Sequence, residues 1–464
     1  MGNVVIVTHW LDGDVIPFIR IGKELRKRGH DVTLITHCYF ESMAKKAGLG
    51  FKSWDTPEEY AVLVDEMQQN KTDNSKGNSY SFSSSEFRQK YESNEMRLKE
   101  FNIILDCCNK HNTVILCKNR SSVAAYMVAE KCKLPLATVM MNPTEVSSML
   151  LYEKLEGMND LPRLNALRKS VNLSSVDSWL QWESSAKMTL ALWPKWYDEV
   201  EDEWPVEIET IGFPLEQGKE AYHREIPSEF ETWLKKNPNP IVITGGTTKC
   251  INDKFYTSSI AACGLLGQPT VVLSRYKEFL PEILPDNVIW YEYLPLDMIM
   301  SKISVLIHHG GMGTLSGALS AGISQLILPC YVDRPYNATL IKRLGVGDFL
   351  YPANWQPEKI ASMIKNLQNE KIRDNCRKYV SEMRNNCGIT VAADRVERLM
   401  KDEKYVYSIN SEYKLLEITD NPNKMDRKQL NVKETNQKIT NQKLTNDQKA
   451  RLLNIYKRRQ GGQK

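Results

Sequence analysis

One stretch of the sequence combines residue types that could bind and stabilise a negatively charged group. His308-His309-Gly310-Gly311 directly follows the short apolar run 303–307, and residues 314–321 then carry the small side chains of a closely packed helix. Glycines at the start of a helix let backbone N–H groups approach an anion, and the helix dipole favours negative charge there by roughly 0.3–1 kcal/mol. His309 adds an imidazole donor at the same place. The pattern predicts an anion-binding turn after a buried strand; an ordinary glycine turn is the alternative.

A second stretch carries an acidic residue near the start of the chain. Residues 4–8 have the apolar, β-branched pattern of a first strand, and Gly13-Asp14 and Pro17 come before a helix predicted over 18–28. The loop after the first strand of an open parallel sheet faces the ligand crevice. Asp14 is therefore placed for proton transfer. The alternative is that its side chain caps the following helix.

Short apolar runs alternate with helical patterns along most of the chain, which indicates parallel sheets covered by helices. The 464 residues, of which 42% are hydrophobic, suffice for two α/β domains with a core each. We place the first domain at 1–215 and the second at 228–405, joined by a polar linker over 216–227. Further strands are predicted over 31–36, 112–117, 135–140, 240–244, 268–273, 288–291 and 325–328, and late helices over 357–367, 370–385 and 389–401.

The composition excludes several classes of protein. The formal net charge is +4, but residues 421–464 hold twelve Lys or Arg against three Asp or Glu, so residues 1–420 carry about 4 − 9 = −5. An acidic body argues against nucleic acid as a partner. No apolar run approaches the roughly 20 residues that span a bilayer, so no transmembrane segment is expected. The ten cysteines lack metal-ligand spacing, which indicates reduced thiols and a cytoplasmic protein.

Two segments lack a core-forming pattern. The polar segment 68–85 is rich in Ser and Asn and is predicted to be a loop or disordered. Residues 411–464 form a basic, flexible tail whose last part could fold into a short amphipathic helix. Residues 444–453, LTNDQKARLL, are similar to the terminal helix at the docking ends of peptide and polyketide assembly-line proteins, and this resemblance implies docking on such a protein. Binding of the helix to an anionic membrane is the other functional interpretation, and a disordered tail is the alternative.

The motifs after residue 308 also resemble a known family. HHGGMGT (308–314), AGISQLILP (321–329), DRPYNA (333–338) and LGVG (344–347) follow one another in the order and spacing of the donor-binding motif of GT-B fold glycosyltransferases of the UDP-glycosyltransferase type. The likeness is to the bacterial branch that includes macrolide, glycopeptide and sterol glycosyltransferases. It implies two Rossmann-like, doubly wound α/β domains that face a central cleft. It also implies that a last helix, at about 388–405, crosses back to the first domain.

The resemblance implies a role for particular residues. Asp14 would be the catalytic base and His309 the catalytic donor at the leaving group, while His9 and Asn142 would contact the acceptor. The donor site would be formed by Gly246, Thr247, Tyr293, Leu294, His309, Gly311, Met312, Gly313, Thr314, Asp333 and Arg334. Relatives commonly have Gln where this chain has Arg334. Either Asp333 alone holds the sugar and Arg334 turns outward, or Arg334 contacts the diphosphate or an acidic sugar.

The implied reaction is an inverting, metal-independent transfer of a sugar from a nucleotide diphosphate, UDP or dTDP, to a hydroxyl of a small hydrophobic natural product. The sequence has no DxD-type cluster flanked by apolar strand residues that would hold a metal, and no cofactor is expected. His309, the N–H groups of Gly311 to Thr314 and Thr247 would instead offset the charge of the leaving diphosphate. The alternatives are glycosylation of a lipid or sterol at a membrane surface, or a catalytically silent GT-B scaffold subunit.

Overall fold

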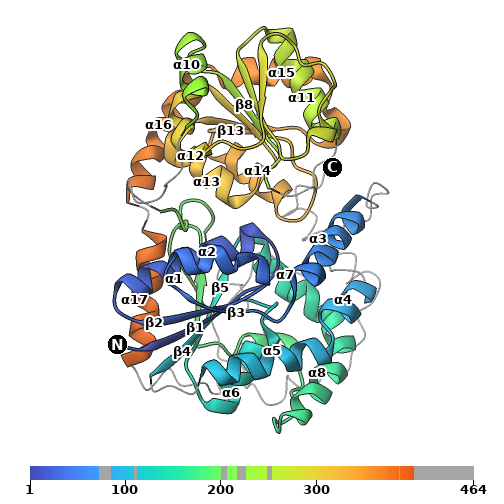
Figure 1. The fold of residues 1–464 in the computed structure, drawn as a ribbon, viewed down its shortest axis with the longest axis vertical. Coiled ribbons are helices and arrows are strands. Elements are labelled where there is room, and N and C mark those ends of the chain that lie inside the picture. Colours follow the sequence, from blue (N-terminus) through green and yellow to red (C-terminus); the bar gives the residue numbers. More distant parts are fainter. Residues whose placement is uncertain are drawn as a thin grey trace, which may run out of the picture.

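The computed structural model describes residues 1–72, 85–108, 112–199, 206–216, 226–247, 253–385 and 387–401, and these form two α/β domains, one above the other in Figure 1. The first holds a parallel sheet with strand order β3-β2-β1-β4-β5-β6-β7, and the second a parallel sheet with order β10-β9-β8-β11-β12-β13. In each sheet the order reverses beside the first strand, as in doubly wound folds. The predicted pair of Rossmann-like domains is therefore confirmed.

The strands are the buried apolar runs of the sequence, because helices cover both faces of each sheet and leave no face for water. In the first sheet they are β1 (Asn3–Val7), β2 (Asp31–Ile35), β3 (Gly50–Lys52), β4 (Thr113–Lys118), β5 (Leu136–Met140), β6 (Met188–Ala191) and β7 (Ile208–Thr210). In the second they are β8 (Ile241–Thr244), β9 (Thr270–Leu273), β10 (Val288–Tyr291), β11 (Val305–His308), β12 (Ser324–Ile327) and β13 (Gly347–Phe349).

The helices connect successive strands. Those of the first domain are α1 (Asp12–Lys27), α2 (Glu41–Lys46), α3 (Pro57–Thr72), α4 (Ser85–Tyr91), α5 (Asn94–Cys107), α6 (Val123–Cys132), α7 (Thr144–Tyr152), α8 (Met158–Ser170) and α9 (Trp179–Glu183). The later ones are α10 (Ser228–Lys236), α11 (Asp253–Leu266), α12 (Leu296–Ile299), α13 (Met312–Ala321), α14 (Arg334–Arg343), α15 (Pro357–Leu367), α16 (Glu370–Arg384) and α17 (Gly388–Lys401).

Helix α1 begins at Asp12, so the prediction that a Gly-Asp turn delays the helix until Phe18 is wrong. The amide of Asp14 donates to the carbonyl of Leu11 at 2.8 Å, which puts Asp14 in the first helical turn. Pro17 lies inside the helix and removes only one N–H near its start. The residue at the N-cap is Leu11, without a side-chain cap, so the alternative that Asp14 caps this helix is also wrong.

The polar segment 68–85 differs in part from the prediction of a loop. Residues 68–72 continue α3, because Gln and Lys sustain a helix that apolar residues have already anchored. Ser85 begins α4. Residues 73–84 lie outside the described residues, as do most of the linker (217–225) and the whole basic tail from 402 onward.

Helix α17 follows the second domain in sequence but packs on α1 and β4 of the first, as the ribbon in Figure 1 shows. Its buried residues Ala392, Val396 and Leu399 share one apolar cluster with Ile21 and Leu25 of α1. Among the described residues no helix is long and apolar enough to cross a membrane. The second domain is thus tied to the first by a helix as well as by the linker.

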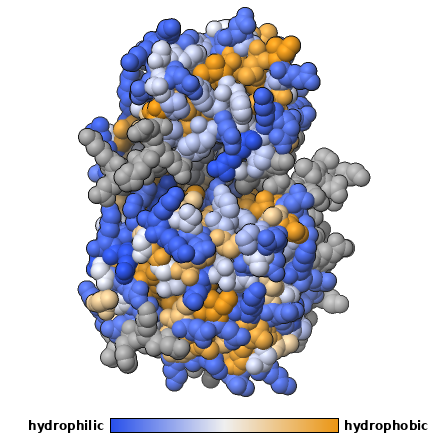
Figure 2. Space-filling view, in the orientation of Figure 1, coloured by the Kyte–Doolittle hydropathy of each residue, from blue (hydrophilic) through white to orange (hydrophobic). Residues whose placement is uncertain are grey.

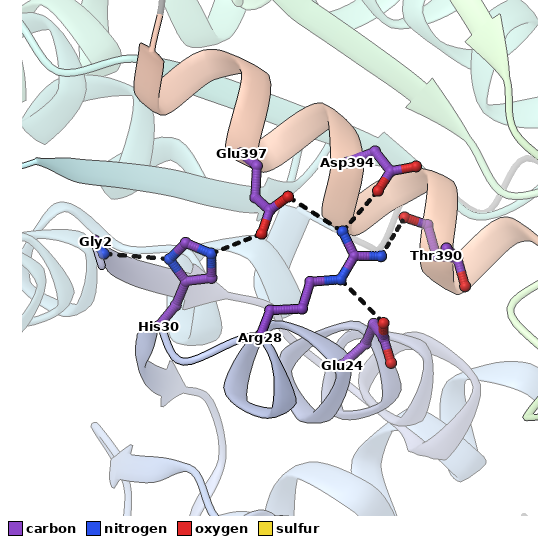
Figure 3. A network of polar contacts seen from close by, with 7 residues as sticks. All are labelled: Gly2, Glu24, Arg28, His30, Thr390, Asp394 and Glu397. Carbon is purple, nitrogen blue, oxygen red and sulfur yellow. Dashed lines mark hydrogen bonds and ion pairs between the residues drawn. The ribbon is translucent and has the colours of Figure 1, made fainter.

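Polar contacts fix α17 in this position (Figure 3). Arg28, at the end of α1, donates to Asp394 at 2.6 Å and to Glu397 at 3.2 Å. His30 Nδ1 accepts from the Gly2 amide at 3.2 Å, so Nε2 carries the ring proton and donates to Glu397 at 2.9 Å. The hydrogen bond from His30 lowers the pKa of Glu397 below its ordinary value.

Candidate functional site

The donor side of the candidate site lies where the strand order of the second sheet reverses, between β8 and β11. His308 pairs with Thr244 in the register of these strands. The turns that follow them, Gly245 to Thr247 and His309 to Gly311, therefore leave the sheet side by side. This is the crevice in which open α/β sheets bind ligands.

The imidazole of His309 occupies the space between these two turns. A Cβ on Gly246 would lie 2.7 Å from His309 Cε1, and one on Gly311 would lie 2.4 Å from His309 Nε2. Both separations are shorter than any van der Waals contact, so only glycine fits at either position. Gly246 also has a φ of +86°, which glycine adopts without strain. The structure thus brings together three predicted donor-site residues.

Burial lowers the pKa of His309 well below its ordinary value, and the positive charge of Arg334 acts in the same direction. His309 is therefore neutral near pH 7 and can donate one ring N–H. His308 is buried as well, and its burial lowers its pKa to about 4. Gly310 N donates to His308 Nδ1 at 3.1 Å, and His308 Nε2 lies 3.0 Å from Gln325 Oε1, so His308 holds the glycine turn in place.

The first turn of α13 offers fewer free amides than predicted. The amides of Thr314 and Leu315 donate to the carbonyl of Gly311 at 3.1 and 3.0 Å. The predicted contribution of the Thr314 N–H to anion binding is therefore wrong, because that N–H is already used within the helix. Met312 and Gly313 occupy the first two helical positions, whose N–H groups have no partner within a helix.

Asp333 and Arg334 lie beside the same glycine turn. Asn337 Nδ2 donates to Asp333 Oδ2 at 2.8 Å and to the carbonyl of Gly310 at 3.0 Å, which fixes the loop after β12 to the loop after β11. Burial raises the pKa of Asp333, against the attraction of Arg334. The Arg334 guanidinium lies 4.9 Å from the centre of the Tyr331 ring. The Nη1 atom of Arg334 is buried, so the side chain does not extend fully into solvent.

The other predicted donor residues lie at the rim. The side chain of Thr247 is exposed, and its carbonyl accepts from the Tyr276 hydroxyl at 3.4 Å. Tyr293 is 44% exposed, so its ring is available to a planar ligand. Leu294 is 2% exposed and packs in the core of the second domain, which leaves only its backbone for ligand contact.

The acceptor side lies at the matching point of the first sheet, between β1 and β4, where Val7 pairs with Cys117. Asp14 follows β1, and Lys118 is the last residue of β4. Lys118 Nζ lies 3.4 Å from Asp14 Oδ1 and 3.9 Å from Oε1 of Glu145, which belongs to α7. The Asp14 side chain is 30% exposed and so remains open to a substrate.

The two predicted acceptor residues have partners within the protein. His9 is 4% exposed; its Nε2 lies 3.2 Å from Glu100 Oε2, and its ring stacks on Trp54 with centroids 4.6 Å apart. Asn142 Oδ1 accepts from the amide and the hydroxyl of Thr144, at 3.1 and 2.6 Å. These contacts account for both residues within the fold of the first domain, and their role toward an acceptor stays a prediction.

Three loops at the sheet edges contain backbone that is unfavourable for its residue type. Trp10 after β1, Arg120 after β4 and Val332 after β12 have φ values of +83°, +60° and +63°. Such conformations cost about 1–3 kcal/mol each outside glycine and gather at functional sites. Trp10 and Arg120 flank the Asp14–Lys118 pair, and Val332 immediately precedes Asp333.

The two sides of the site face one another across the domain boundary, where hydrophilic side chains of both domains meet in Figure 2. The negative charge of Asp14 contributes to the raised pKa of Asp333 in the other domain. Tyr197, from the segment after β6, donates to Asn337 Oδ1 at 3.3 Å. The Tyr336 hydroxyl donates to Asp198 at 3.0 Å. The domains are therefore held with the two sheet edges opposed.

Sequence reasoning missed three residues of this site, namely Lys118, Glu145 and Asn337. Lys118 ends the apolar run TVILCK, and a charge at the end of a buried strand beside the first strand was a usable signal. Asn337 stands four residues after Asp333 on the predicted helix and so shares its face. Nothing in the sequence around Glu145 links it to Asp14.

Two family models match the chain, one on each domain. The model described as the glycosyltransferase family 28 N-terminal domain matches residues 12–150. The model described as the erythromycin biosynthesis protein CIII-like C-terminal domain matches residues 270–399. The first match includes Asp14 and Lys118, and the second includes the HHGGMGT motif.

Individual relatives extend the similarity over most of the chain. The sterol 3-beta-glucosyltransferase of Pichia angusta is 23% identical over 450 residues, which is 89% of this chain and 35% of that protein, so the chain spans about a third of its length. Among solved structures, the glycotransferase of kitacinnamycin superposes with a TM-score of 0.64 at 16% identity, over 86% of this chain and 99% of that one. The glycosyltransferase VinC in complex with DTDP gives 0.62 at 16% identity, over 86% and 99%. With both domain models in the expected order on a GT-B fold, the chain belongs to the GT-B fold, UDP-glycosyltransferase-like family.

Proposed function

We propose that this protein is an inverting, metal-independent glycosyltransferase that moves a sugar from a nucleotide diphosphate to a hydroxyl of a small hydrophobic acceptor. The observation that carries the proposal is the position of the His309 ring between the glycine turns after β8 and β11. That arrangement presents a neutral N–H donor at a helix N-terminus, and Asp14 lies at the opposing sheet edge.

On the donor side, the bond from the anomeric carbon to the diphosphate breaks, and negative charge builds on the leaving oxygen. The His309 N–H and the amides of Met312 and Gly313 are fixed dipoles that can offset this charge without a metal ion. The exposed ring of Tyr293 offers a stacking surface for the nucleotide base. In this proposal Arg334 supplies a positive charge to a diphosphate oxygen or to an acidic sugar.

On the acceptor side, Asp14 would take the proton of the acceptor hydroxyl as its oxygen attacks the anomeric carbon. A positioned general base typically contributes 10²–10⁴ in rate. Attack from the face opposite the diphosphate inverts the anomeric configuration in a single displacement. The opposed sheet edges supply base and leaving-group donor from different domains, which suits such an in-line reaction.

Two acceptor classes compete. The curated relative named a sterol 3-beta-glucosyltransferase favours a sterol or lipid at a membrane surface, at 23% identity. The neighbour named for kitacinnamycin favours a natural product, and the neighbour bound to DTDP favours a thymidine nucleotide as donor. A silent scaffold is disfavoured because Asp14 and the HHGG turn are both present. Docking of the tail on an assembly-line protein stays a prediction.

A binding screen followed by a transfer assay tests the proposal. UDP, dTDP and their glucose and rhamnose conjugates are added in a thermal-shift assay, where a ligand at 100 times its Kd stabilises the protein by about 2.7 kcal/mol. Transfer to ergosterol and to macrolide aglycones is then followed with and without EDTA, and NMR identifies the anomer formed. Asp14→Asn should keep donor binding and lose transfer. Absence of binding by every nucleotide sugar would refute the proposal.

A further inference from the structure

A buried tyrosine of the first domain contacts the donor side of the second. Tyr197 follows β6 in the chain, and its side chain is fully buried. Helices α13 and α14 lie on the side of the second domain that faces the first (Figure 1). The Tyr197 hydroxyl donates to Asn337 Oδ1 of α14 at 3.3 Å and lies 3.9 Å from the sulfur of Met312, the first residue of α13. One hydroxyl group therefore reaches both helices that begin at the donor site.

The buried amide of Asn337 has one orientation that satisfies its hydrogen bonds. Its Nδ2 donates to Asp333 Oδ2 at 2.8 Å and to the Gly310 carbonyl at 3.0 Å. A carbonyl oxygen can only accept, so the nitrogen of the amide must face Gly310 and its oxygen must face Tyr197. The Tyr197 hydroxyl thus completes the amide that joins the loop after β12 to the loop after β11.

Tyr197 is itself fixed against the second domain. Arg343 Nη2, at the end of α14, donates to the Tyr197 carbonyl at 2.6 Å. The Tyr197 ring belongs to an apolar cluster that also contains Phe213 of the first domain and Leu315 and Ile341 of the second. Because packed interiors transmit strain instead of absorbing it, a shift of the segment that carries Tyr197 should also shift the start of α14.

We propose that Tyr197 is a positioning residue for donor binding, which acts through Asn337 to orient the Asp333 carboxylate toward the sugar of the nucleotide sugar. This inference rests on the proposed function and on the expected role of Asp333 toward the sugar. Tyr197 itself would contact neither the sugar nor the nucleotide. The first domain would therefore influence how a donor is bound in the second domain.

The sugar should depend on Tyr197 more than the diphosphate does. When the Asn337 amide loses its fixed orientation, the Asp333 carboxylate loses the hydrogen bond from Nδ2. The glycine turn keeps a second hydrogen bond, from Gly310 N to His308 Nδ1 at 3.1 Å. The group expected at the sugar is thus released, while the turn expected at the diphosphate is still held.

Calorimetry with a nucleotide sugar and its free nucleotide tests this role. Tyr197→Phe removes the hydroxyl group and keeps the ring in the apolar cluster. The Kd of UDP-glucose should rise about tenfold, as for one hydrogen bond lost from a buried group, while the Kd of UDP should change less than about twofold. dTDP-glucose and dTDP replace them if the wild type binds only thymidine nucleotides. An equal loss for sugar nucleotide and free nucleotide would be a general structural effect and would overturn the role toward the sugar.

A double-mutant cycle and a matched control assign the effect to the amide. In Asn337→Ala the amide is absent, so adding Tyr197→Phe should raise the Kd of UDP-glucose no further. Tyr336→Phe is the control, because it removes another tyrosine hydroxyl at the same domain boundary, one that donates to Asp198 at 3.0 Å. Its ratio of the two Kd values should equal that of wild type. A ratio that rises as much as in Tyr197→Phe would overturn the inference.

Hydrogen exchange measures the positioning in protein without a ligand. In Tyr197→Phe, amides of residues 309–314 and 333–338 should exchange about tenfold faster than in wild type, whereas those of α15 should be unchanged. Wild-type exchange rates in folded Tyr197→Phe would overturn the inference, whatever the protein catalyses. Faster exchange in a protein that binds no nucleotide sugar, even as wild type, would refute the proposed function and leave the positioning intact. If thermal unfolding shows that Tyr197→Phe is not folded, Asn337→Ser, which removes the same link, is measured with the same expectations.

Discussion

Replacing Gly311 by alanine should displace His309 without any other change to the site. Gly311 is the N-cap of α13 with φ −71° and ψ 143°, a conformation that alanine adopts freely. The new Cβ would lie 2.4 Å from His309 Nε2, whereas an ordinary contact needs about 3.4 Å. The imidazole must therefore move by about 3.4 − 2.4 = 1.0 Å.

A displacement of this size should lower kcat by about 10²-fold, because misplacing a catalytic group by 1 Å costs about that much. Removing such a donor altogether, as in His309→Ala, costs about 10²–10³ in kcat and sets the upper limit. Crowding in a packed region should also destabilise Gly311→Ala by about 1–3 kcal/mol. The measurements are kcat at saturating donor and acceptor, donor Kd by calorimetry, and urea denaturation.

A double-mutant cycle identifies the cause. In His309→Ala/Gly311→Ala the ring is gone and the added methyl group fits, so kcat should equal that of His309→Ala and the stability lost in Gly311→Ala should return. Gly317→Ala, in the same helix, is the control, because its Cβ would meet only the flexible end of Met300 at 3.1 Å. A further loss of kcat on adding Gly311→Ala to His309→Ala would show that the reasoning about His309 is wrong.

Three further predictions concern the surrounding structure. Burial lowers the pKa of His308 from 6.5 to about 4. Between these pH values the unfolded chain takes up a proton that the folded protein does not, so the free energy of unfolding should fall by about 3 kcal/mol as the pH falls. Urea denaturation of His308→Gln should not show this decrease. Arg28→Ala should lower the free energy of unfolding by about 1 kcal/mol near pH 7, measured by urea denaturation, because Arg28 holds α17 through Asp394 and Glu397. The pKa of Glu397 is lowered in the fold, so the difference between variant and wild type should shrink below about pH 4.5, as Glu397 becomes protonated. Truncation at Glu412 should leave the melting temperature and transfer to a soluble acceptor unchanged, since the apolar contacts of α17 end before Lys401; a truncated protein that unfolds would show that the tail packs on the body.

Much of the fold could be predicted because its strands are buried on both faces. β10 coincides with the predicted 288–291, and α15 with the predicted 357–367, which Pro357 marks at its first position. The start of α1 could not be predicted in the same way. Gly13 and Pro17 favour a turn in isolation, and the helix passes through both because its apolar face, from Val15 to Leu25, is buried against the sheet.

The candidate site divides along similar lines. The closeness of the HHGGMGT turn to Gly246 was predictable, because the motif is contiguous and Gly246 follows the first strand of the same domain. At the edge of the first sheet, only the position of Asp14 after the first strand was predictable. Lys118 lies near Asp14 because β4 pairs with β1, and Glu145 lies near Lys118 because α7 packs at the same sheet edge. Neither contact could be predicted from the spacing of these residues in the sequence.

The two sides of the site surround their central residues differently, and each environment suits its proposed task. Burial keeps His309 uncharged, so it can donate a hydrogen bond to a leaving oxygen but holds no proton that it could release as an acid near pH 7. Asp14 lies 3.4 Å from the Lys118 ammonium, and its side chain is 30% exposed, so a substrate can reach it. Because Asp14 also acts on Asp333 across the domain boundary, bringing the sheet edges closer would strengthen the repulsion between two carboxylates. A sugar between them, donating hydroxyl groups to both, relieves that repulsion, and the domains would therefore close more readily on substrate than on an empty site.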